Sequence, residues 1–144
     1  MIATDVKGNA VVQVLAGTGL NATVCEAPLN RVVDCVPVDE ETLRVAIVTD
    51  DIVEDLYIDQ VMESFMTAGF EVSICDIPRG EKSEEATKRT AILDQLAARH
   101  LTRTDMVVAL GGDAVCDLAG AAAASYLDGC KFVQIPTTKL AAVG

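Results

Sequence analysis

Residues 105–138 read DMVVALGGDAVCDLAGAAAASYLDGCKFVQIPTT, and this stretch decides the expected fold. Residues 107–110 are uncharged and rich in valine, which is typical of a strand buried on both faces of a parallel sheet. A pair of glycines follows at once, and the small residues of 113–127 favour a helix packed close against a sheet. An apolar run at 132–136 predicts a second strand. The order strand, glycine turn, helix, strand indicates a right-handed βαβ unit if the two strands are parallel.

The glycine pair lies where a parallel sheet binds ligands. In βαβ units the ligand sits at the carboxyl ends of the strands, and a glycine turn lets phosphate approach the N-terminus of the helix. We therefore expect Gly111 and Gly112 to present backbone N–H groups to a diphosphate, although a tight turn that needs free φ angles would also explain them. Thr137 and Thr138 stand just beyond the second strand, where they either contact the same ligand or simply end the strand.

Strands and helices alternate along the chain from residue 44 onward. A buried strand is predicted at 44–50 and an amphipathic helix at 51–68, which Gly69 ends. A further strand at 71–77 and a helix at 83–100 follow. The inward face of this second helix is expected to carry Ala86, Ile92, Leu93, Leu96 and Ala97. The alternation predicts an α/β fold, a Rossmann-like parallel sheet flanked by helices, formed as a single domain over residues 1–144.

The first 40 residues carry weaker patterns. Short strands are predicted at 11–15 and 23–25, and residues 27–33 are expected to open a helix. No internal repeat, low-complexity tract or interdomain linker separates this part from the rest of the sequence.

Composition and charge exclude several classes of function. The net charge of −11 argues against nonspecific nucleic-acid binding, because a phosphate backbone would be repelled. No apolar run approaches the ~18 residues of a membrane span and the N-terminus lacks a signal-peptide pattern, so a cytoplasmic protein is expected. The five cysteines form no Cys-x-x-Cys pair, which predicts reduced thiols packed in the core rather than a zinc or redox motif. They are Cys25, Cys35, Cys75, Cys116 and Cys130.

For three single polar residues, a functional role has to be weighed against a structural one. Asp50 follows a predicted strand, where an acid can accept hydrogen bonds from ribose hydroxyls or simply cap the next helix. Asp117 lies one turn into the Ala-rich helix, where the helix dipole also favours an ordinary surface acid. His100 is interpreted as a solvated residue or a cation at a helix C-terminus rather than a ligand.

Several short motifs, taken together, resemble the NAD-binding N-terminal half of 3-dehydroquinate synthase. The resemblance covers roughly residues 31–143 in consistent order and spacing, which is far more specific than one glycine pair. It is carried by residues 77–81 (IPRGE), 107–112 (VVALGG), 117–120 (DLAG), 122–127 (AAASYL) and 132–138 (FVQIPTT).

The resemblance implies NAD as cofactor and a set of residues that contact it. Asp50 would accept the ribose hydroxyls, and Asp117 would lie on the nicotinamide side. Gly80 and Glu81 belong to a cofactor loop in the family, although a plain capping turn after Pro78 would also explain them. The complete implied set is Asp50, Gly80, Glu81, Gly111, Gly112, Asp113, Asp117, Thr137 and Thr138.

The reaction implied by the resemblance belongs to the shikimate pathway of aromatic amino acid biosynthesis. A 3-dehydroquinate synthase converts the sugar phosphate 3-deoxy-arabino-heptulosonate 7-phosphate to 3-dehydroquinate and phosphate, and regenerates NAD in each turnover. In the family a divalent metal, usually zinc, is held by one Glu and two His of a C-terminal helical domain. That domain is absent from this sequence, so the chain alone is expected to be inactive. A homodimer is expected by analogy.

Five positions depart from the family pattern. Glu84 replaces a cofactor-facing lysine and Asp113 replaces the third glycine of the turn, so each brings negative charge towards the expected diphosphate. Each could weaken binding by ~1 kcal/mol or more if partly buried, so tight NAD binding is not expected. Asp128 replaces an arginine thought to reach substrate phosphate, Gly144 replaces an aspartate, and Cys116 replaces a glycine.

Three functions remain open at this point. The chain is either the cofactor half of a 3-dehydroquinate synthase, a degenerate binding or regulatory module of the same fold, or part of another sugar-phosphate cyclase or a polyol dehydrogenase. The acidic residues Glu84, Asp113 and Asp128 favour the second. The Pro-Thr-Thr sequence at 136–138 favours a cyclase over a polyol dehydrogenase.

Overall fold

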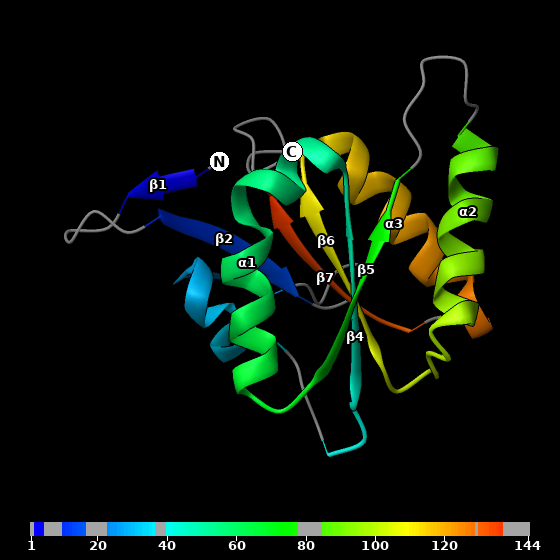
Figure 1. Cartoon of the computed structure of the whole chain (residues 1–144), viewed down its shortest axis with the longest axis horizontal. Helices are drawn as coiled ribbons and strands as arrows, with labels where there is room; N and C mark the ends of the chain where they lie inside the picture. The colour runs from blue at the N-terminus through cyan, green and yellow to red at the C-terminus, as the bar shows by residue number, and fades with distance from the viewer. Residues whose placement is uncertain are drawn as a thin grey trace.

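The computed structural model describes residues 2–4, 10–16, 23–36, 40–77, 85–128 and 130–136 (Figure 1). Its strands join in one seven-stranded sheet of order β1-β2-β7-β6-β4-β5, with β3 also paired to β2. The strands are β1 (Ile2–Thr4), β2 (Ala10–Ala16), β3 (Thr23–Pro28), β4 (Arg44–Thr49), β5 (Glu71–Asp76), β6 (Met106–Gly111) and β7 (Lys131–Pro136). The α-helices are α1 (Asp51–Thr67), α2 (Glu85–Ala98) and α3 (Asp113–Ser125), and the 3-10 helices are η2 (Leu29–Cys35) and η3 (Tyr126–Asp128).

The part of the sheet that follows residue 44 is parallel, as predicted. β4 pairs in parallel with β5 and β6, and β6 pairs in parallel with β7. The run from β6 through α3 to β7 is therefore a βαβ unit. The first three strands differ from the prediction of a parallel sheet, because β2 runs antiparallel to β1, β3 and β7. β1, β2 and β3 follow one another in sequence, and antiparallel neighbours need only short connections, whereas parallel pairs need a crossover such as α1, α2 or α3.

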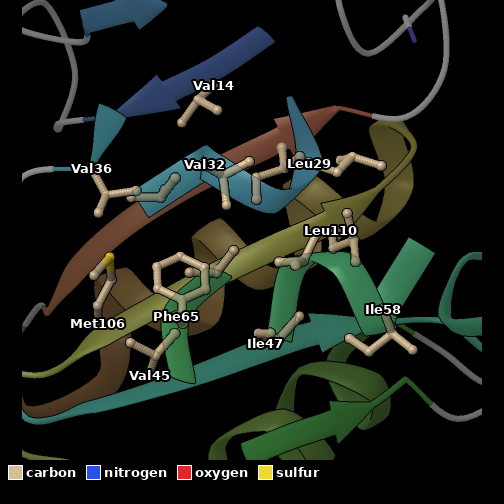
Figure 2. Packing of buried hydrophobic residues seen from close by; sticks show 14 residues of the cluster. Val14, Leu29, Val32, Val36, Val45, Ile47, Ile58, Phe65, Met106 and Leu110 are labelled. Atoms are coloured by element: carbon tan, nitrogen blue, oxygen red, sulfur yellow. The ribbon is translucent and has the colours of Figure 1, made fainter. Parts of the chain in front are cut away.

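Helices cover both faces of the parallel strands, and the alternation along β4 explains why. Val45 and Ile47 point to the face covered by α1 and η2, whereas Ala46 and Val48 point to the face covered by α2 and α3. Every residue of β4 from Val45 to Thr49 is buried, as expected for a strand between two helical layers. Figure 2 shows Phe65 of α1 lying between Val45 and residues of η2 in the first of these cores.

Two helices end in the same hydrogen-bond pattern. At the end of α1, Gly69 N–H donates to the Met66 carbonyl and Phe70 N–H to the Phe65 carbonyl, with Gly69 at φ 99°. This left-handed end confirms the predicted role of Gly69. At the end of α2, His100 takes the same place at φ 60°, where a non-glycine residue is uncommon. Its side chain is exposed, in agreement with a solvated histidine.

The prediction of which residues of α2 face inward is partly wrong. Ile92 and Leu96 are buried and Leu93 is partly buried, as predicted. Ala86 and Ala97 are exposed, because only the central stripe of α2 faces the sheet and α3. None of the helices in the described part of the chain has the length and apolar character needed to cross a membrane.

The cysteines divide into two groups. Cys75, Cys116 and Cys130 are thiols buried in the core under α2 and α3, which confirms the predicted packing role for these three. Cys25 and Cys35 form a disulfide, contrary to the prediction of reduced thiols. The turn from β3 directly into η2 brings their Cα atoms to 6.2 Å, within the range that a disulfide spans. The strands predicted near 11–15 and 23–25 are present as β2 and β3, and the helix predicted from residue 27 is the 3-10 helix η2.

Candidate functional site

The strand order creates a switch point between β4 and β6. From β4 the chain runs through α1 to β5 on one side, and β6 then lies on the other side of β4. In open α/β sheets, ligands bind outside the carboxyl ends of the strands at such a point. We call this margin of the sheet the carboxyl edge, defined by Asp50, Asp76 with Ile77, Gly111 with Gly112, and Pro136.

Asp50 and the glycine turn come together at the carboxyl edge. Thr49 pairs with Leu110 across the two strands, so Asp50 and Gly111 each follow a paired residue at the same level of the sheet. Asp50 is partly buried. The structure thus places a carboxylate-bearing residue beside the N-terminus of α3, which is the arrangement expected for ribose and diphosphate recognition.

Gly111 must be glycine because α3 sits directly on it. A Cβ atom built at Gly111 would lie 2.8 Å from the Val115 Cβ and 2.9 Å from both Val115 methyl carbons. Real Cβ atoms do not approach side-chain carbons so closely. The absence of a side chain at Gly111 is what lets the first turn of α3 descend onto the end of β6.

Gly112 begins α3 without a side-chain cap. Its carbonyl accepts the first helical hydrogen bond from Cys116 N–H at 3.0 Å, and Cys116 Sγ donates to the Gly111 carbonyl at 3.7 Å. Most helices begin at a residue whose side chain accepts hydrogen bonds from the first-turn N–H groups, and Gly112 has no such side chain. An anion is the natural acceptor for N–H groups in this position.

The first two turns of α3 carry two of the predicted acids. Asp113 is the first residue of the helix, and Asp117 lies one turn later with an exposed side chain. Farther along, the position of a Cβ at Gly120 would be 3.3 Å from the Phe132 ring, so α3 is also held close to β7.

The end of β5 is fixed from two sides. Ile77 N–H donates to the Thr49 carbonyl of β4 at 3.0 Å. On the other side, Gln95 of α2 accepts a hydrogen bond from Asp76 N–H at 3.1 Å and donates one to the Asp76 carbonyl at 3.0 Å. Sequence reasoning missed Gln95, although a polar residue between Ile92 and Leu96 on the inward stripe of α2 was a usable signal.

The remaining predicted cofactor residues lie outside the described part of the chain. These are Gly80, Glu81, Thr137 and Thr138, and the same holds for the departures Glu84 and Gly144. Thr137 follows directly after Pro136, which pairs with Gly111 at the carboxyl edge.

The opposite margin of the parallel strands is built quite differently. We call it the amino edge, defined by residues 42–44, 101–105, 126–128, 130 and 131. Asp105 is buried there, and its carboxylate accepts hydrogen bonds from the backbone N–H groups of Leu43, Arg44 and Thr102 at 2.9–3.1 Å. Burial raises the pKa of Asp105, but these hydrogen bonds outweigh it and hold the pKa below its ordinary value of 3.8.

Two further side chains tie the amino edge together. Tyr126 donates its hydroxyl hydrogen bond to the Leu101 carbonyl at 2.7 Å, and burial raises the pKa of this tyrosine. Lys131 Nζ donates to Thr42 Oγ1 at 2.7 Å, and Thr42 donates to the Thr104 carbonyl at 2.9 Å. These contacts join strand starts and helix ends that are far apart in sequence, so their role is structural.

The described part of the chain also has shallow pockets whose linings contain none of the predicted cofactor residues. A shallow pocket of about 380 Å³ lies between η2 and α1, and it is lined by Asn30, Arg31, Val33, Asp34, Glu63, Ser64, Thr67 and Ala68. Within the described ranges, no group of three or more His, Cys, Asp or Glu residues could hold a metal ion.

Comparison with known proteins agrees with the motifs. The family model for the N-terminal part of 3-dehydroquinate synthase matches residues 74–144, which include β6, the glycine turn, α3 and β7. Over these residues the chain is similar to the 3-dehydroquinate synthases. The 3-dehydroquinate synthase of Enterococcus faecalis is 45% identical over 100 residues, which are 69% of this chain and 28% of that enzyme. The 3-dehydroquinate synthase of Pelobacter propionicus matches to the same extent. The chain therefore spans little more than a quarter of these relatives.

Solved structures of sugar-phosphate cyclases share the fold of this chain. A 2-deoxy-scyllo-inosose synthase complexed with carbaglucose-6-phosphate, NAD+ and Co2+ superposes with a TM-score of 0.71 at 23% identity, covering 83% of this chain and 34% of that one. The 2-epi-5-epi-valiolone synthase of Streptomyces hygroscopicus, with NAD+ and Zn2+ bound, gives a TM-score of 0.60 at 30% identity. That match covers 67% of this chain and 27% of the other.

Proposed function

We propose that this chain is the NAD-binding part of a 3-dehydroquinate synthase. The whole enzyme would convert 3-deoxy-arabino-heptulosonate 7-phosphate to 3-dehydroquinate and phosphate, in the shikimate pathway. The observation that carries the proposal is the Gly111-Gly112 turn, which lies within the region that matches the family model and next to Asp50 at the switch point. The fit is physical, because a helix N-terminus capped by glycine offers N–H groups to a diphosphate.

Each residue of the carboxyl edge has a role in this proposal. The first-turn N–H groups of α3 after Gly112 would bind the diphosphate. Asp50 would accept hydrogen bonds from ribose hydroxyls, and Asp117 would face the nicotinamide. Bound NAD would supply a reversible hydride acceptor for a substrate hydroxyl. Further contacts are proposed for Gly80, Glu81, Asp113, Thr137 and Thr138.

Catalysis would require a part of the enzyme that the match does not cover. The metal that activates the substrate would be held by a C-terminal helical domain, so the chain alone is proposed to release no phosphate from the sugar phosphate. We further propose that the whole enzyme is a cytoplasmic homodimer. Two solved structures of the same fold are a 2-deoxy-scyllo-inosose synthase and a 2-epi-5-epi-valiolone synthase, so another cyclase reaction is the alternative.

A degenerate binding module is the second candidate function. Asp113 begins α3, where a carboxylate competes with a diphosphate for the same N–H groups. Glu84 and Asp128 add further negative charge in place of basic family residues. Since two like charges near a phosphate weaken its binding, this candidate predicts a stable fold with no affinity for NAD.

Calorimetric titration with NAD separates these two functions. The chain as it stands is compared with the double variant Asp113→Gly, Glu84→Lys, which restores the family residues. A control double variant, Asp59→Asn with Glu63→Lys on the exposed side of α1, changes the net charge by the same amount away from the carboxyl edge. Binding by the unaltered chain supports the cofactor half. Binding only by the restored variant supports the degenerate module. Binding by the control variant as well would show that the change in net charge alone explains the gain in NAD affinity.

A further inference from the structure

The side-chain amide of Gln95 occupies the place of a neighbouring strand at the end of β5. β5 is the last strand of the sheet, with β4 on one side only. The outward N–H and C=O groups of such an edge strand have no ladder partner. Gln95 satisfies both groups of a single residue, since its Oε1 accepts from Asp76 N–H at 3.1 Å and its Nε2 donates to the Asp76 carbonyl at 3.0 Å.

A third hydrogen bond fixes which way this amide points. Gln95 Nε2 also donates to the Ala91 carbonyl one turn earlier in α2, at 3.3 Å. The nitrogen therefore has two acceptors and the oxygen has one donor, which a flipped amide could not reproduce. The amide is thus anchored on its own helix and held in register with the Asp76 peptide groups.

The same strand end is coupled to the candidate site through β4. Ile77 N–H donates to the Thr49 carbonyl, and Asp50 is the next residue after Thr49. A shift of the Asp76–Ile77 backbone would therefore break or bend a hydrogen bond one residue from Asp50. The sequence reaches Gly80 three residues after Ile77.

We propose that Gln95 is a positioning residue for the ribose side of the NAD site: by clamping Asp76 it holds the end of β5 level with Thr49 and so fixes Asp50. This inference rests on the proposed function, because it assigns Gln95 to the NAD site proposed above. It predicts that Gln95 affects the ribose side of the site and not the diphosphate side at Gly111 and Gly112, which belongs to β6 and α3.

The test uses Gln95→Leu, which keeps much of the side-chain volume and removes all three hydrogen bonds. Gln95→Glu keeps an acceptor for Asp76 N–H and loses the donor for its carbonyl. Gln60→Leu on the exposed surface of α1 is the matched control. Amide hydrogen exchange at Ile77 reports the strand end without any ligand, and titrations with NAD and with inorganic diphosphate report the two sides of the site.

In Gln95→Leu we expect exchange at Ile77 to become about 10-fold faster and the Kd for NAD to rise about 5-fold, with diphosphate affinity changed less than about 2-fold. Gln95→Glu should give an intermediate change, and Gln60→Leu should give none. Equal losses of NAD and diphosphate affinity would overturn the inference, because they would mark Gln95 as merely structural. Unchanged exchange at Ile77 would overturn it as well.

Failure of the proposed function looks different. A chain that binds neither NAD nor diphosphate, even with Asp113→Gly and Glu84→Lys, would contradict the NAD site and with it the cofactor role of Gln95. Exchange at Ile77 would still decide separately whether Gln95 holds the end of β5.

Discussion

The two margins of the parallel strands use opposite chemistry. At the amino edge, side chains bind backbone: Asp105 accepts three N–H groups, and Tyr126 and Lys131 reach loops far away in sequence. At the carboxyl edge, the turn between β6 and α3 has no side chain at all over Gly111 and Gly112. A margin whose polar groups already satisfy one another stabilises the fold. A margin that presents backbone N–H groups and acids can bind a ligand.

The largest expected effect comes from Asp105→Ala. This substitution leaves the backbone N–H groups of Leu43, Arg44 and Thr102 without their buried acceptor. Hydrogen bonds to a charged group are the strong ones, so we expect the free energy of unfolding to fall by about 3 kcal/mol in urea titrations. Asp117→Ala at the carboxyl edge is the matched control, with an expected change within about 0.5 kcal/mol because its side chain is exposed.

The pH dependence of stability gives an independent check on Asp105. Its pKa in the folded chain lies below the ordinary 3.8, so the folded state favours the ionised form. The stabilisation is present above about pH 4 and is lost as the pH falls through the lowered pKa. Asp105→Asn should lack this part of the acid-induced loss. If the free energy of unfolding fell equally with acid pH in the unaltered chain and in Asp105→Asn, this role of Asp105 would be contradicted.

Gly111→Ala should have the next largest effect. The new methyl group would lie 2.8–2.9 Å from the Val115 side chain, so α3 must move away from β6. We expect a loss of about 2 kcal/mol in stability and loss of NAD binding, measured by urea unfolding and calorimetry. Adding Val115→Ala makes room for the methyl group, so the double variant should lose less stability than the sum of the two single variants. Simple additivity would show that the two residues are not in contact.

Tyr126→Phe should cost about 1 kcal/mol of stability. It removes the hydrogen bond of 2.7 Å to the Leu101 carbonyl and keeps the ring. Because this bond belongs to the amino edge, the affinity of the folded protein for NAD should stay the same. A loss of NAD affinity in Tyr126→Phe would contradict the separation of a stabilising amino edge from a ligand-binding carboxyl edge.

The smallest expected effect is on the chemical reactivity of the buried thiols Cys75 and Cys130. Burial raises the pKa of Cys75 and of Cys130 to about 11, so only about a thousandth of each is thiolate at pH 8. Alkylation followed by mass spectrometry should be slow at pH 8 and faster towards pH 11. Rapid alkylation of Cys75 or Cys130 at pH 8 would contradict this expectation.

Much of the fold after residue 44 could be predicted from the sequence, because each element there carries its own pattern. The buried runs of β4 and β6 and the glycine that ends α1 are local signals. The pairing of β2 with β7 could not be predicted, since it joins Leu15 to Gln134 across most of the chain and no local pattern specifies the partner. The Cys25–Cys35 bond likewise depends on how β3 meets η2.

The candidate site was predictable residue by residue but not in its arrangement. Asp50 and Gly111 were each expected at the end of a strand, whereas their adjacency follows from β6 lying beside β4. Asp105 was not singled out, because its partners Leu43 and Arg44 are some sixty residues away. Gln95 was missed because a single polar residue in an amphipathic helix is most simply assigned to solvent.

The antiparallel strand β2 limits where another strand could join the sheet. β7 has β6 on one side and β2 on the other, so the ladder positions along both of its sides are in use where these strands overlap. A further strand therefore has no free place next to β7 in that region, so the sheet cannot be extended at this point by another part of the chain or by a partner.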